Sequence, residues 1–95
     1  MTTEMRVALG RVVHFERIRR RWRQADLAER SGLQRTRLSD IEAGRVDVPL
    51  STIERLAAAF GITPSELLQQ AQQEQRRGLS GERRGGALDP GAEGS

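Results

Sequence analysis

One short stretch of the chain collects polar side chains of the types that read the edges of DNA bases. Arginine can donate two hydrogen bonds to guanine, and glutamine can make two with adenine. A helical pattern leaves these side chains together on the outward side of one segment. They are Gln34, Arg35, Thr36, Arg37 and Asp40. The residue types therefore predict contact with the major groove of duplex DNA.

Two amphipathic helical patterns, residues 24–31 and 35–43, position these side chains. In the second pattern Leu38 and Ile41 are three residues apart and face inward, which turns the polar residues outward. Gly32 separates the two patterns. Glycine adopts the left-handed backbone conformation at little cost, so the chain can turn sharply there. Two short helices joined by such a turn are typical of a helix-turn-helix.

The composition describes a small helical domain with few residues suited to catalysis. The chain has 95 residues, of which 36% are hydrophobic, and this suits a single core. It has no cysteine and one histidine, His14, so thiolate metal sites and histidine-based catalytic pairs lack their residues. We expect no enzymatic activity, metal or cofactor. No apolar run approaches the roughly 20 residues that span a bilayer, which predicts a cytoplasmic protein without membrane contact.

Positive charge is concentrated in the half of the chain that holds the helix-turn-helix pattern. Residues 11–45 contain ten arginines and five acidic residues, whereas residues 51–75 contain one arginine and three acidic residues. Four arginines lie within five positions, at Arg19, Arg20, Arg21 and Arg23. Such a cluster indicates contact with phosphate, or else a solvated helix end whose cations complement the helix dipole.

Further helices are predicted on both sides of this pair. A first helix spans residues 7–22. Its apolar residues Phe15 and Ile18 do not fall on one narrow face with the others, so the sequence does not decide which side of this helix faces the core. A fourth helix begins at Ser51, in capping-box spacing with Glu54. A fifth begins after Thr63 as the N-cap, with proline first and glutamate third. The glycines at 10, 32, 44 and 61 are each expected near a helix boundary or loop.

Composition divides the chain into two parts. Residues 1–75 form the predicted helix-turn-helix domain. Residues 78–95 hold six of the ten glycines and only two large apolar residues, Leu79 and Leu88. We therefore expect a disordered, glycine- and arginine-rich tail over residues 76–95.

Several short motifs stand in a fixed order along the chain. They are Gln24 ahead of Leu27-Ala28, Gly32, Ser39 before Ile41-Glu42-Ala43-Gly44, and Leu56-Ala57 before Gly61-Ile62. In this order and spacing, residues 9–68 resemble the phage-repressor and Cro-type helix-turn-helix family, also called XRE-like. The resemblance implies an all-α, compact five-helix domain of the lambda-repressor type, with the helix at 35–43 in the major groove.

The resemblance also implies roles for individual residues. Base contacts are implied for Gln34, Arg35, Thr36 and Asp40. Contact with the DNA backbone, or a place near it, is implied for Gln24, Arg23, Arg37, Ser39 and Arg45. Arg17 and Glu42 match a family pair that joins the first helix to the third. We expect a partly buried, structural ion pair there that orients the reading helix; a surface pair is the alternative.

Three residues depart from the family pattern. Arg23 stands where serine or threonine usually caps the second helix. Glu16 stands where leucine is common, which leaves open a rotated first helix that would displace Arg17. Asp40 is acidic on the side that faces DNA. It could accept a hydrogen bond from a cytosine amino group, or it could pair with Arg37.

The favoured hypothesis is a sequence-specific transcriptional regulator that binds duplex DNA as a homodimer at an inverted repeat. Within the family, the sequence is most similar to small standalone regulators, including the controller proteins of restriction-modification systems. Ile62, Leu67 and Leu68 are candidates for the dimer face, and equally for the core. The alternative is an antitoxin, in which the tail binds a protein partner.

Overall fold

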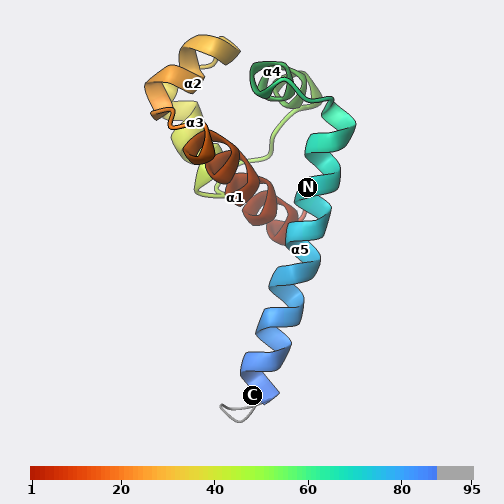
Figure 1. The fold of residues 1–95 in the computed structure, drawn as a ribbon. Helices are drawn as coiled ribbons and strands as arrows, with labels where there is room; N and C mark the ends of the chain where they lie inside the picture. Colours follow the sequence, from red (N-terminus) through yellow and green to blue (C-terminus); the bar gives the residue numbers. More distant parts are fainter. Residues whose placement is uncertain (88–95) are drawn as a thin grey trace.

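Five helices make up the regular structure of the part of the chain that the computed structural model describes. The backbone is described for residues 1–87 and the side chains for residues 1–78. In chain order (Figure 1) the helices are α1 (Thr3–Arg19), α2 (Gln24–Ser31), α3 (Arg35–Glu42), α4 (Leu50–Phe60) and α5 (Pro64–Ala87). The predicted all-α, five-helix fold class is confirmed. Within residues 1–87, no helix has the length and apolar character needed to cross a membrane.

The starts of α4 and α5 test two predicted capping boxes. At α5, Thr63 and Glu66 bond reciprocally: the threonine hydroxyl accepts from the Glu66 N–H at 3.0 Å, and the glutamate carboxylate accepts from the Thr63 N–H at 2.8 Å. At α4 the predicted box of Ser51 and Glu54 is wrong. The N-cap residue is Pro49, in extended conformation, so Ser51 already lies inside the helix and its hydroxyl is not placed to cap it.

The first helix is displaced towards the N-terminus relative to the prediction. It begins at Thr3 and ends at Arg19, three residues before the predicted end at Trp22. Arg21 takes a left-handed conformation with φ 60°, and the Trp22 N–H then donates to the carbonyl of Arg17 at 3.1 Å. This is the usual turn that closes a helix, made here with arginine in the position where glycine is common.

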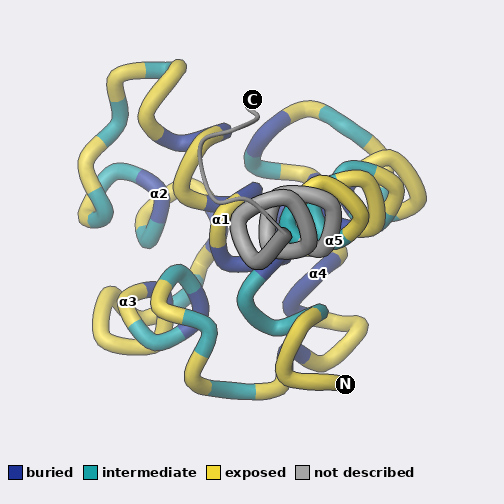
Figure 2. Tube along the Cα trace, turned by 90° about the horizontal axis from the view of Figure 1, so that it is seen from below, coloured by how far each residue is buried: buried dark blue, intermediate teal, exposed yellow. Residues whose placement is uncertain are grey.

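The core forms around α1, which lies between the α2 and α3 pair and the α4 and α5 pair (Figure 2). Each helix supplies at least one side chain with almost no exposure. The largest of these are Leu9, Val13, Leu27, Leu38, Ile41, Leu56 and Leu67. Burying one such side chain contributes about 1.5–3 kcal/mol. The core therefore fixes how α2 and α3 sit relative to the rest of the domain.

Gly10 permits a close crossing of α1 and α3. It lies inside α1, so the prediction that it marks a helix boundary is wrong. A Cβ atom at this position would lie 2.7 Å from the carbonyl oxygen of Glu42 and closer still to that of Ile41. Both neighbours are backbone atoms and cannot rotate away. Only glycine lets the end of α3 rest directly on α1.

Gly10→Ala is expected to lower the free energy of unfolding by about 1–3 kcal/mol, the usual cost of overpacking a tight contact. The matched control is Gly78→Ala in α5, where the nearest atom to an added Cβ is a flexible Arg11 nitrogen at 3.8 Å. That change should be neutral or stabilising by up to about 1 kcal/mol, because alanine favours helix. Urea unfolding of both variants makes the comparison, and equal effects would contradict it.

The last helix is longer than the sequence predicts. α5 continues to Ala87, over residues 76–87 where a disordered tail is expected. The glutamine, glutamate and arginine residues that precede this point are good helix formers, and buried Leu67 and Ala71 anchor the start of the helix. Residues 88–95, with the rest of the predicted tail, lie outside the described part of the chain. The division at residue 76 stays a prediction.

Candidate nucleic-acid interface

The start of α3 is an exposed polar surface. Gln34 occupies the N-cap in extended conformation, and its side chain makes no capping hydrogen bond. Arg35, Thr36 and Arg37 follow in the first turn and are exposed, as is Ser39. On the opposite side of the helix, Leu38 and Ile41 are buried. The structure thus leaves the predicted reading residues Gln34, Arg35 and Thr36 exposed, and Asp40 lies half-exposed one helical turn after Thr36.

The turn before α3 and the start of α2 complete this surface. Gly32 has φ 75° and makes the sharp turn between the two helices. Arg23 is the N-cap of α2, with an 86% exposed side chain. Its backbone N–H donates to the carboxylate of Asp26 at 2.8 Å, and this bond is the main cause that lowers the pKa of Asp26. Asp26 therefore supplies a reverse cap where the usual serine or threonine is missing.

Glu42, at the end of α3, binds side chains from both preceding helices. Its carboxylate accepts from Arg17 of α1 at 2.7 and 3.0 Å, and from the Gln24 amide of α2 at 3.3 Å. The Arg17 and Glu42 side chains are only 10% and 7% exposed. The pair is thus buried, and it does not lie on the surface. The same carboxylate therefore also holds Gln24, which the sequence predicts to contact the DNA backbone.

His14 is part of this Glu42 cluster, and sequence reasoning missed it. Its Nδ1 lies 3.0 Å from Oε1 of Glu42, while 55% of its side chain stays exposed. Burial raises the pKa of Glu42, but hydrogen bonds from Arg17, His14 and Gln24 outweigh it and hold that pKa below its ordinary value. The sequence could have indicated this contact, because His14 lies one helical turn before Arg17 and therefore on the same face of the helix.

Asp40 pairs with a residue that the sequence did not indicate. Nη1 of Arg45 donates to Oδ1 of Asp40 at 3.2 Å, and the backbone N–H of Arg45 donates to the Asp40 carbonyl at 3.0 Å. The alternative of an Asp40 pair with Arg37 is therefore wrong. Gly44, with φ 73°, turns the chain so that Arg45 returns beside α3. Arg45 and Asp40 remain largely open to solvent, with 65% and 48% of their side chains exposed.

The exposure of four consecutive residues shows which side of α1 packs against the rest of the protein. Phe15 and Ile18 are 61% and 49% exposed, whereas Glu16 and Arg17 are buried, with only 4% and 8% exposed. The helix is therefore not rotated to bury its larger apolar residues. Arg17 points to α3, as the family pattern implies, and the carboxylate of Glu16 takes the position of the usual leucine.

Glu16 also divides the arginine cluster that follows it. Its carboxylate accepts hydrogen bonds from Arg19 and Arg20, and Arg20 donates further to the carbonyl of Phe60 at 2.8 Å. Burial raises the pKa of Glu16, but these arginines outweigh it and lower that pKa. Two of the four clustered arginines are thus bound within the protein. The predicted contact of this cluster with phosphate stays a prediction.

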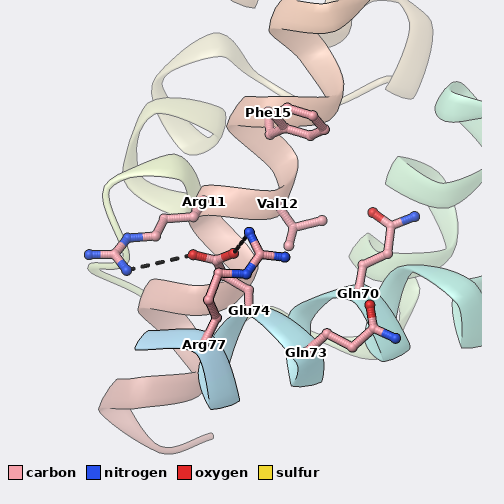
Figure 3. Close-up of a pocket in the computed structure, with 7 residues that line it drawn as sticks. All are labelled: Arg11, Val12, Phe15, Gln70, Gln73, Glu74 and Arg77. Carbon is pink, nitrogen blue, oxygen red and sulfur yellow. Dashed lines mark ion pairs between the residues drawn. The ribbon is translucent and has the colours of Figure 1, made fainter. Parts of the chain in front are cut away.

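A groove lies between α1 and α5 (Figure 3). Arg11 and Arg77 both approach the carboxylate of Glu74, at 3.7 and 3.4 Å. Val12 and Phe15 form its apolar part, with glutamines of α5 opposite. Two guanidinium groups thus share one carboxylate here, and this groove is separate from the exposed start of α3.

Two short helices joined at a left-handed glycine, with an exposed polar turn at the start of the second, define a helix-turn-helix DNA-binding domain. The comparison with protein families agrees: residues 8–70 match the family described as helix-turn-helix domain. The chain belongs to the phage-repressor and Cro-type (XRE-like) branch of this family of transcription regulators, and the resemblance seen in the sequence is confirmed.

Individual relatives are named as control proteins, regulators or transcription factors. The control protein C.BamHI of Bacillus amyloliquefaciens is 38% identical over 69 residues, which cover 72% of this chain and 85% of that protein. A hypothetical transcription factor of Neisseria meningitidis is 37% identical over 65 residues, or 68% of this chain. The match spans only 61% of the Neisseria protein. The crystal structure of the clp gene regulator ClgR from Corynebacterium glutamicum aligns with a TM-score of 0.77 at 25% identity, covering 83% of this chain and 84% of that one.

Proposed function

We propose that the protein is a sequence-specific regulator of transcription that acts in the cytoplasm as a homodimer on an inverted-repeat DNA site. The observation that carries this proposal is the free first turn of α3. Gln34, Arg35 and Thr36 are exposed there, and their side chains suit the base edges of the major groove. The Glu42 cluster supports the proposal because it holds α3 against α1 and α2.

The backbone contacts in this proposal surround the reading turn. Gln24 and Arg23 stand at the N-terminus of α2, where free backbone N–H groups favour a phosphate. Arg37, Ser39 and Arg45 flank the outward side of α3 and its C-terminal turn. Such contacts fix the register of the protein on the duplex, and the base contacts then select its sequence.

The proposed dimer doubles the few base contacts that one small domain offers. Leu67 is fully buried and belongs to the core. Ile62 and Leu68 are only partly buried. The proposed dimer face is therefore the start of α5 and the connection before it, where these two side chains lie. A twofold axis there would place the two reading helices about one helical turn, roughly 34 Å, apart.

Selection from a random duplex library with the full chain tests the proposal. We expect a palindromic site whose affinity falls steeply with salt, and a preference of about 10³ or more over random DNA. Weak, salt-sensitive binding with no enriched sequence would contradict sequence-specific reading. Enrichment of a single half-site would contradict the proposed dimer but not sequence-specific binding.

Two substitutions should separate base contacts from backbone contacts on the selected site. Arg35→Ala should lower discrimination at one base pair of each half-site by about 1–3 kcal/mol, because arginine reads guanine through two hydrogen bonds. Gln24→Ala should weaken all sequences alike. Competition assays against single-base variants of the site measure both effects. An equal loss on every sequence for Arg35→Ala would show that Arg35 does not read a base.

A further inference from the structure

Asp40 and Arg45 form a fixed unit on the outward side of α3. The carboxylate and the guanidinium are joined at 3.2 Å, and a backbone hydrogen bond of 3.0 Å joins the same two residues. Because Gly44 makes the turn between them, the position of Arg45 depends on the backbone as well as on its side chain. Asp40 therefore has a defined orientation before any DNA is bound.

This unit shares a helical stripe with the proposed reading turn. Asp40 lies four residues after Thr36, which is one turn further along the same face. Leu38 and Ile41 are buried on the opposite side. Among residues 1–78, the described side chains offer Asp40 one cation, Arg45, and this contact engages Oδ1. Its Oδ2 remains an acceptor, on a side chain that is 48% exposed.

A carboxylate on this stripe favours one base. It only accepts hydrogen bonds, and in the major groove the amino groups of cytosine and adenine are the donors. On adenine the amino group stands beside N7, which is itself an acceptor and repels a carboxylate. Cytosine presents its amino group without such a neighbour. The carboxylate of Asp40 thus matches the edge of a C·G pair better than that of an A·T pair.

We propose that Asp40 selects cytosine in the operator half-site and that Arg45 is the positioning residue that makes this possible. The inference rests on the proposed function, because it names a base that the DNA-binding surface reads. A lone carboxylate would be repelled by the phosphates that line the groove. Paired with Arg45 it carries no net charge, and the remaining guanidinium N–H groups of Arg45 can bind an adjacent phosphate.

The first test is Asp40→Asn in the full chain, measured by competition against sites carrying each of the four base pairs at every position. Asparagine has the same shape but can make two hydrogen bonds with adenine. We expect wild type to prefer cytosine at one position by about tenfold or more, and the variant to lose that preference or to favour adenine there. The Asp40 side chain is about half exposed, so the substitution should leave the fold intact, which thermal unfolding of the variant verifies.

The second test separates positioning from simple charge. Arg45→Ala should lower the cytosine preference at the same position several-fold, and it should also reduce the salt dependence of binding by about one ion. The matched control is Arg11→Ala, which removes an equally exposed arginine, at 60%, from the α1 and α5 groove. It should leave the cytosine preference unchanged. If Arg37→Ala, and not Arg45→Ala, lowers the preference, the assignment of Arg45 is wrong.

The outcomes distinguish this inference from the proposed function. If wild type selects a palindrome and Asp40→Asn leaves every base preference unchanged, the cytosine assignment fails while sequence-specific binding stands. If wild type selects no sequence, the proposed function and this inference fail together. A change confined to one base pair per half-site supports both.

Discussion

Glu42→Gln is expected to lower the free energy of unfolding by about 3 kcal/mol. Removing one partner of a buried ion pair costs roughly 3–5 kcal/mol, because the other charge stays buried without compensation. The lower end applies here, since His14 leaves one side of the cluster open to solvent. Urea unfolding can be followed by the fluorescence of Trp22, the only tryptophan, whose ring stacks on Phe60 at 6.1 Å.

Glu54→Gln is the matched control, because it makes the same chemical change at an exposed position of α4. It should alter stability by no more than about 0.5 kcal/mol. The double variant Arg17→Met and Glu42→Gln should lose less than the sum of the two single variants, as contacting residues do. A loss for Glu42→Gln as small as that of the control would show that the buried pair does not stabilise the fold.

The same cluster connects the stability of the domain to its DNA-binding surface. Glu42 terminates α3, Arg17 comes from the last turn of α1, and Gln24 stands at the start of α2. Gly10 adds direct contact between α1 and the last carbonyl groups of α3. The reading helix is therefore held at its C-terminal end, which leaves its first turn free. This division explains how so small a domain can keep an exposed polar turn and still have a defined orientation for α3.

Much of the fold could be predicted because its signals are local. The C-terminal end of α2 depends on Gly32, and the start of α5 depends on Thr63 and Glu66. Each of these residues lies within a few positions of the boundary that it sets. The end of α1 was predicted wrongly because no local signal marks it. Arg21 adopts a left-handed conformation without the glycine that normally marks it, so the sequence carries no local sign of the turn.

The candidate site was less predictable, because its pairs join distant segments. Arg17 and Glu42 are 25 residues apart, and only the family resemblance suggested their contact. The Asp40 partner depends on how Gly44 turns the chain, and residue types alone suggested Arg37 as the one protein partner. Glu16 was predictable in principle. Its cations, Arg19 and Arg20, follow by one helical turn, a spacing at which opposite charges pair on any helix.

Acid is expected to remove the stability that Glu16 and Glu42 contribute. Burial raises the pKa of each carboxyl, but hydrogen bonds from the neighbouring arginines prevail, and both pKa values lie below the ordinary value of 4.5. A carboxyl whose pKa is lower in the folded protein binds its proton more readily in the unfolded chain. Its stabilising effect is therefore complete above about pH 4.5 to 5 and is lost as the pH falls through the folded pKa.

Urea unfolding of wild type and Glu42→Gln at a series of pH values measures this loss. The difference of about 3 kcal/mol expected near neutral pH should shrink below about pH 4.5, because the unfolded wild-type chain then binds a proton at Glu42 that the folded protein binds only at lower pH. A difference that stays constant down to about pH 3 would mean that the carboxylate charge is not what stabilises the cluster.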